Sequence, residues 1–218
     1  MMFLRYRPAT LRDLNECQFC LRDSFAFNEQ TRPRLISLWR ELMQSGQGNA
    51  AVIEDISASL GSRIQWFCFK VFATKEQGDY FKQEAPPLLA RNLVERHQQG
   101  LPLPLMTADQ LRQANLPQGE GVTMVVLNSG FSLPLLQDPG KMRLIADKVI
   151  DFNCYFVAGY NLREVLLELY DDFSFAWGRG AGYHLRSDYA PFHASRSAGK
   201  PSPKDEPEPQ LWGVNREE

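Results

Sequence analysis

Two kinds of side chain in this sequence could move protons. Glu168 and Tyr170 stand two positions apart at the end of one apolar segment. A carboxylate can act as a general base and a phenol as a general acid when a substrate reaches them. Glu54 or Asp55 could replace the base, and Tyr183 could replace the acid. Because carboxylates at strand ends are usually solvated, a structural role is the competing interpretation.

A second group of residues could bind an anion. Ser129, Gly130 and Lys141 lie in a polar stretch that leads from a strand into a helix beginning near Asp138. Main-chain N–H groups at a helix start bind anions. This stretch has no Gly-x-Gly pattern, and it contains two prolines, which remove N–H donors. An ordinary loop is therefore the simpler interpretation, and an anion cradle of unusual sequence is the alternative.

Cysteine and histidine spacing does not predict a metal site. Cys17 and Cys20 have the Cys-x-x-Cys spacing, but they fall within an expected helix, and no second pair completes four ligands. We interpret them as buried thiols, since free cysteine is among the most buried residue types. His97 and His193 flank polar segments, which favours solvated side chains, and His184 more simply meets a main-chain carbonyl.

The composition is that of a globular protein and limits its partners. The 218 residues are 44% hydrophobic and 23% charged. A net charge of −2 and a pI near 6.0 give no electrostatic footprint for DNA or RNA, so we expect no direct nucleic-acid binding. No apolar run approaches the ~20 residues that span a bilayer, and no secretion signal is evident. We therefore expect no membrane association and a cytoplasmic location.

Hydrophobic periodicity predicts the elements that position these residues. The strand from Arg63 to Thr74 is mostly apolar on both faces, which places it centrally in a sheet. The segment from Asn161 to Asp171 fits a helix or a strand, and we interpret it as a strand because a strand completes the order of the neighbouring elements. The other expected elements are helices at 10–23 and 35–43, a strand at 50–55, helical pieces within 75–120, a strand at 121–127 and a helix from 138.

This order of elements, opened by Arg7-Pro8-Ala9-Thr10 and closed by a strand after Gly182-Tyr183, resembles the GCN5-related N-acetyltransferase (GNAT) superfamily over about residues 3–190. The resemblance implies an α/β fold, more closely an α+β mixed sheet, with helices on both faces of a central sheet. It also implies acetyl-CoA or another acyl-CoA as the cofactor. The implied residues are Ser129, Gly130 and Lys141 for the cofactor, Glu168 and Tyr170 for catalysis, and Trp66 and Phe131 for the substrate pocket.

Two departures from the family pattern shape the functional hypothesis. The Gly-x-Gly turn is missing, and Gly178 stands where the family often has a tyrosine that protonates the leaving thiolate. A residue without a suitable proton cannot act as the acid. We therefore expect a domain that senses a small-molecule ligand or regulates, without acetyltransferase turnover. The alternative is a divergent acyl-CoA-dependent N-acyltransferase, and a third possibility is a protein-interaction domain with a filled cleft.

The end of the chain changes in composition. Residues 194–209 contain four prolines and almost no apolar side chains, so we interpret 194–218 as a disordered linker and tail. It would come after a GNAT-like domain at 1–193 that carries an inserted helical segment at 75–120. Leu211-Trp212-Gly213-Val214 and the residues after it predict the first turn of a helix. With the motifs around Gly159 and Gly182, this ending also resembles the N-terminal part of bacterial regulators with a LuxR-type helix-turn-helix domain, which implies such a domain downstream.

Overall fold

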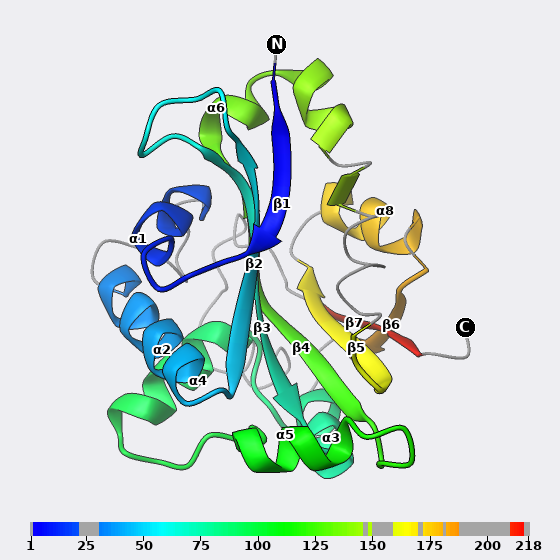
Figure 1. Cartoon of the computed structure of the whole chain (residues 1–218). Helices are drawn as coiled ribbons and strands as arrows, with labels where there is room; N and C mark the ends of the chain where they lie inside the picture. The colour runs from blue at the N-terminus through cyan, green and yellow to red at the C-terminus, as the bar shows by residue number, and fades with distance from the viewer. Residues whose placement is uncertain are drawn as a thin grey trace, which may run out of the picture.

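The computed structural model describes residues 2–21, 31–145, 148–149, 159–169, 172–180, 182–187 and 210–215. Its centre is a seven-stranded sheet in the order β1-β2-β3-β4-β5-β7-β6 (Figure 1). Adjacent strands are antiparallel, except that β4 and β5 run parallel. The strands are β1 Leu4–Pro8, β2 Gly48–Asp55, β3 Ile64–Ala73, β4 Val122–Phe131, β5 Leu162–Leu169, β6 His184–Ser187 and β7 Gln210–Asn215.

Helices cover both faces of this sheet. In Figure 1, α1, α2 and α4 lie to the left of the sheet and α8 lies to its right. The expected α/β architecture, with a mixed sheet between helices, is confirmed. The helices are α1 Leu14–Cys17, the 3-10 helix η1 Gln18–Cys20, α2 Arg32–Gln44, α3 Lys75–Gln83, α4 Leu89–Gln98, α5 Ala108–Ala114, α6 Leu133–Leu136 and α8 Asp172–Gly180.

The sheet has a hydrophobic core on each face. Trp39 of α2 stacks on Phe69 of β3, with ring centroids 5.2 Å apart, and both side chains are fully buried. On the other face, Trp66 and Phe72 of β3 belong to a second core that includes Leu135 of α6. Burying an aromatic or leucine side chain stabilises the fold by about 1.5–3 kcal/mol. The central position that we predicted for β3 is confirmed, because it is buried on both faces.

Two other expectations about the elements have clear outcomes. The segment that fitted either a helix or a strand is the strand β5, in agreement with our interpretation. The expected first helix is wrong in its start, because α1 begins only at Leu14. Thr10 does not cap it. Instead, the main-chain N–H and hydroxyl of Thr10 donate to the carboxylate of Asp13, which holds the chain in a turn before the helix.

Residues 210–215 form a strand of the sheet, which corrects our interpretation of them as tail and helix start. β7 lies between β5 and β6, and Leu211 and Trp212 are buried. A short apolar run after a long polar segment carries no local sign of the strand that it will pair with, so sequence alone could not place it. The proposed linker at 194–209 lies outside the described residues. Within the described ranges, no helix has the length and apolar character needed to cross a bilayer.

Candidate functional site

β4 and β5 stop pairing before either strand ends. Their parallel register runs from Val122 and Leu162 to Val126 and Leu167, whereas β4 continues to Phe131. The pairing of β3 with β4 shifts at the same place, between Phe69 and the next residue of β3. Such an irregularity bends a strand and re-aims the residues beyond it. Within the described part of the chain, β5 therefore leaves the last five residues of β4 without a main-chain partner on that side.

The unpaired edge offers main-chain groups to a ligand. The N–H of Ser132 donates to the carbonyl of Gln65 on β3. Residues of an antiparallel pair alternate in the side to which they turn their hydrogen-bonding groups. Gly130 therefore faces β3 with its partner Phe67, and Ser129 turns its N–H and C=O toward the β5 side. We name residues 127–131 the parted edge.

The structure brings together three residues that the sequence assigned to ligand and substrate binding. The indole N–H of Trp66 donates to the hydroxyl of Ser129 at 3.0 Å, and Phe131 is the β4 neighbour of Trp66. Trp66 is buried, Phe131 is half-buried and Ser129 is exposed. An indole, a hydroxyl and a phenyl ring thus lie beside one another at the parted edge.

Gly130 also lies on this edge, but its lack of a side chain has a packing cause. A Cβ at this position would collide with the main-chain carbonyl oxygen of Cys20, at the end of η1. Gly130 therefore lets η1 cross closely over β4. Its φ is not positive, so it provides no special turn. The anion cradle, which was the alternative to an ordinary loop, would have to be built on the end of strand β4 here.

The helix start near Asp138 already has its main-chain donors engaged. The N–H groups of residues 135–138 donate to carbonyls within this stretch, and residues 134 and 139 are prolines. The carboxylate of Asp138 accepts the N–H of Lys141 at 3.1 Å and its ammonium at 2.8 Å. The Lys141 side chain and the N–H groups of Lys141 and Gly140 lower the pKa of Asp138. A negative charge of the protein itself thus takes the place of a bound anion.

Glu168 lies on β5 with its carboxylate directed at a helix. Its two oxygens accept the main-chain N–H groups of Leu88 at 2.8 Å and of Leu89 at 2.9 Å, at the start of α4. Both bonds are buried, and the carboxylate is stabilised by the positive end of the helix dipole. Tyr170, its expected catalytic partner, lies outside the described residues.

Gly178, where the family often has a tyrosine, lies in α8 and packs closely on β5. A Cβ there would be 2.6 Å from Cδ1 of Leu169, so a larger residue would require the Leu169 side chain to move. This chain therefore has no phenol at the position of the family's acid.

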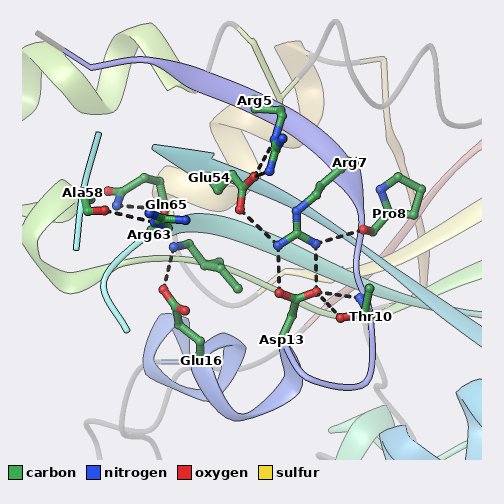
Figure 2. Close-up of polar contacts among 11 residues, drawn as sticks. Arg5, Arg7, Pro8, Thr10, Asp13, Glu16, Glu54, Ala58, Arg63 and Gln65 are labelled. Carbon is green, nitrogen blue, oxygen red and sulfur yellow. Dashed lines mark hydrogen bonds and ion pairs between the residues drawn. The ribbon is translucent and has the colours of Figure 1, made fainter. Parts of the chain in front are cut away.

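A charged network joins β1, β2 and the start of α1, and sequence reasoning missed it. Figure 2 shows Arg7 between Asp13 and Glu54: its guanidinium forms two bonds of 2.8 Å with Asp13 and one of 3.0 Å with Glu54. Nε of Arg5 adds a bond of 2.6 Å to Glu54. Burial alone would raise the pKa of Asp13, but the bonds from Arg7 and Thr10 lower it to about 2. The network fixes the first strand to the first helix.

A polar cavity of about 260 Å³ opens at the other end of β4 and β5. Its lining has six charged side chains and one hydroxyl, from Lys75, Asp79, Lys82, Thr123, Arg163, Glu164 and Arg186. Sequence reasoning missed this cavity as well. The spacing of Lys75, Asp79 and Lys82, which places them on one face of α3, was the available signal.

The three described cysteines are buried thiols, as expected for Cys17 and Cys20. Cys17, Cys20 and Cys68 are free and buried. Burial raises the pKa of all three, that of Cys20 to about 12, so these thiols stay protonated. Across the described ranges, no three His, Cys, Asp or Glu side chains gather in an arrangement that could hold a metal ion.

Comparison with solved structures identifies the fold. No protein-family model matches the chain, and no curated protein matches its sequence. The structure is similar to NAA60 of Arabidopsis thaliana in complex with acetyl-CoA, with a TM-score of 0.54 and 11% identity over 99% of this chain and 100% of that one. NAA60 with a bisubstrate analogue gives 0.53 and 12% over 98% of each chain.

A third similar structure is a chimera of the spermidine N-acetyltransferase SpeG from Vibrio cholerae and hSSAT. It has a TM-score of 0.50 and 9% identity, over 98% of this chain and 96% of that one. At these identities the likeness bears on architecture alone. The strand order agrees with this likeness, as does the parallel pair β4 and β5, which separates after Val126. The chain has the fold of the GCN5-related N-acetyltransferases.

Proposed function

We propose that this protein is a divergent acyl-CoA-dependent N-acyltransferase that binds the thioester arm of its donor along the parted edge of β4. The observation that carries the proposal is the unpaired main chain of residues 127–131. An extended ligand that contains amide groups can add to such an edge as a further strand would. The pantetheine arm of CoA contains two amide groups, and it ends in the thiol that carries the acyl group.

The side chains at the edge would orient the donor. The N–H and C=O of Ser129 are the main-chain groups that would pair with an amide. The indole N–H of Trp66 holds the Ser129 hydroxyl in place by a hydrogen bond. The acyl-CoA would supply a thioester, which an amine can attack. Phe131 and Trp66 would border the acyl group and exclude water from it. Lys141 and Gly130, our other expected cofactor residues, would contribute little, since Asp138 engages one and η1 covers the other.

The residues fit the arm of the donor better than its diphosphate. At the helix start after β4, the main-chain N–H groups of residues 135–138 and 141 are engaged, and residues 134 and 139 have none. The Asp138 carboxylate adds a negative charge beside the N–H of Gly140. A diphosphate would meet that charge and few N–H donors there. We therefore expect most of the binding free energy to come from the arm.

Proton transfer is the step for which this chain differs most from the family pattern. Glu168 and Tyr170 remain our predicted catalytic residues, but both oxygens of Glu168 already accept main-chain N–H groups. An amine that loses its proton to water before it attacks would need no protein base. Positioning of donor and acceptor would then supply the rate acceleration.

The ligand-sensing domain without turnover is the second candidate, and Gly178 favours it. Because this residue is a glycine, the departing thiolate has no phenol at that position to protonate it. A sensing domain would bind its ligand at the parted edge, and the bound state would regulate a partner, such as the helix-turn-helix domain of a transcription regulator. The segment that suggested such a domain forms β7, so the residue evidence for it is weaker than the evidence for a donor site.

Calorimetry and a turnover assay separate the candidates. The full chain would be titrated with acetyl-CoA and with S-acetyl-pantetheine, and thiol release would be followed with a panel of primary amines. Binding with amine-dependent thiol release supports the acyltransferase. Saturable binding without release by any amine supports the sensing domain. Failure to bind either thioester at millimolar concentration would overturn both.

A further inference from the structure

The polar cavity at the starts of β4 and β5 is separate from the parted edge. Thr123 and Glu164, which line it, are main-chain neighbours at the beginning of the two strands, whereas the parting begins only after Val126. α3 packs over this end of the sheet, against β3, β4 and β6. None of the cavity's residues belongs to the proposed acyl-donor site.

Local irregularity in β5 sets the direction of Arg163. Val122 pairs with Leu162, and Thr123 pairs with Glu164, so Arg163 is an additional residue without a partner on β4. Bulges of this kind re-aim a side chain, and they are common beside functional sites. Arg163 is one of the residues that line the cavity.

One arm of the Arg163 guanidinium has no acceptor among the described residues. Nη2 of Arg163 donates to the carbonyls of Glu120 at 2.8 Å and Gly121 at 3.0 Å, which hold the side chain in place. Nη1 is buried and has no hydrogen-bond partner in the same described ranges. A buried cationic donor without an acceptor is costly, and an anionic ligand would relieve that cost.

Ion pairs hold the rest of the lining in place. Lys82 bonds to both acids of the cavity, to Asp79 at 2.9 Å and to Glu164 at 3.0 Å. Nε of Arg186 reaches Glu164 at 3.0 Å across β7, and the passage is open because Gly213 has no side chain. The cationic partners lower the pKa of Asp79 to about 2, so this acid stays ionised.

The charge balance of the lining favours an anion. Four cationic side chains face two carboxylates, which leaves two positive charges in excess. Each carboxylate is already bonded by two cations, so a cationic ligand would find no unpaired acid in this lining. The hydroxyl of Thr123 adds a neutral polar group at the base of the cavity.

We propose that this cavity binds a small oxyanion, the phosphate or carboxylate group of a metabolite-sized ligand, at a site distinct from the acyl-donor site. Arg163 and Arg186 would provide a planar pair of donors, which suits the two-oxygen geometry of both groups. Lys75 at the rim would add a point charge. The site would let an anionic metabolite stabilise the junction of α3, β5 and β6.

Titration calorimetry of the full chain tests the proposal with three probes: inorganic phosphate, pyrophosphate and citrate, at constant ionic strength. Saturable binding of the phosphates would identify a phosphate site, and saturable binding of citrate would identify a carboxylate site. Arg163→Gln should weaken the bound probe about tenfold or more, as expected for a lost charge-assisted hydrogen bond. Lys75→Gln should weaken it about two- to fivefold, as expected for an exposed charge.

Matched controls keep the result interpretable. Arg91→Gln removes an exposed cation that is paired with Glu95 on α4 and does not line the cavity, so it should leave affinity unchanged. If Arg163→Gln does not fold, Lys75→Gln and Thr123→Val carry the test. Absence of saturable binding by all three probes, or equal losses in Lys75→Gln and Arg91→Gln, would overturn the proposal. None of the probes carries a pantetheine arm, so the result does not depend on whether the parted edge binds a donor, and a loss of binding in Arg163→Gln assigns the probe to this cavity.

Discussion

Glu168 of β5 holds the main chain of Leu88 in a left-handed conformation at the start of α4. Leu88 has φ of 67°, and its N–H donates to Glu168 at 2.8 Å. A non-glycine residue in this region costs about 1–3 kcal/mol, so other contacts must offset it. The charged bonds to Glu168 and the burial of the Leu88 side chain do so. The position that we expected to be catalytic is thus also a structural connection between β5 and α4.

Replacement of Glu168 should show this structural role. Glu168→Gln keeps the size of the side chain but loses one acceptor and the charge, so we expect unfolding free energy to fall by about 1–3 kcal/mol. Urea denaturation measures it. As a control, Glu95→Gln, on the exposed face of α4, should lower the free energy of unfolding far less. Unchanged stability with abolished turnover would instead support Glu168 as the base.

The parted edge can be tested with two substitutions at one position. Ser129→Pro removes the N–H that faces the β5 side and leaves the bonds to β3 intact, because proline is tolerated where its nitrogen faces away from the partner strand. We expect acetyl-CoA and S-acetyl-pantetheine to bind about tenfold more weakly or not at all. Ser129→Ala keeps the N–H and should bind nearly as wild type does. Equal affinities of the two variants would contradict main-chain pairing with the donor.

The helix start after β4 predicts the relative affinities of acetyl-CoA and S-acetyl-pantetheine. Since Asp138 engages the N–H groups that a diphosphate would need, wild type should bind acetyl-CoA little better than S-acetyl-pantetheine. Asp138→Ala frees these groups and the Lys141 ammonium. It should strengthen acetyl-CoA binding about two- to fivefold, as expected for one charge at an exposed helix start, and leave S-acetyl-pantetheine unchanged. Calorimetry of both donors measures the ratio, and a strong preference for acetyl-CoA in wild type would count against this account.

The central sheet was predictable from the sequence because its signals are local. Two-sided apolar alternation marked β3, and valines marked β4. Helical pieces were expected within 75–120, and α5, which begins with a capping box at Thr107, is one of them. Trp66, Ser129 and Phe131 were expected at a cofactor or substrate site, and the structure shows that the three residues are neighbours.

The features that the sequence could not predict depend on contacts between distant segments. Gly130 suggested a loop that binds anions. The residue lacks a side chain because the carbonyl of Cys20, more than a hundred positions away in the chain, occupies the space that a Cβ would need. The pairing of β7 with β5, and of Arg186 with Glu164 across it, is likewise invisible to local patterns. The Arg7 network was missed for this reason, because its members come from different elements, and so were the partners that β5 and β6 add to the α3 side of the cavity.

The Arg7 network predicts how stability changes in acid. The folded protein lowers the pKa of Asp13 to about 2, below the ordinary value near 3.9 of an unfolded chain. A lowered pKa means that the carboxylate contributes stability above pH ~4 and that this contribution is lost as pH falls toward 2. Arg7 also lowers the pKa of Glu54, first by its hydrogen bond, so Glu54 acts in the same direction.

Asp13→Asn isolates this contribution. We expect it to reduce unfolding free energy at pH 7 on the order of 1 kcal/mol, a modest value because water screens the partly exposed pair. Between pH 4 and 2, the free energy of unfolding of Asp13→Asn should fall less steeply than that of wild type. Denaturation at a series of pH values measures both slopes. Asp109→Asn, which breaks an exposed pair on α5, should keep the wild-type slope. If Asp13→Asn also kept it, the pKa of Asp13 would not be lowered by folding, and Arg7 would serve only to join β1 to α1.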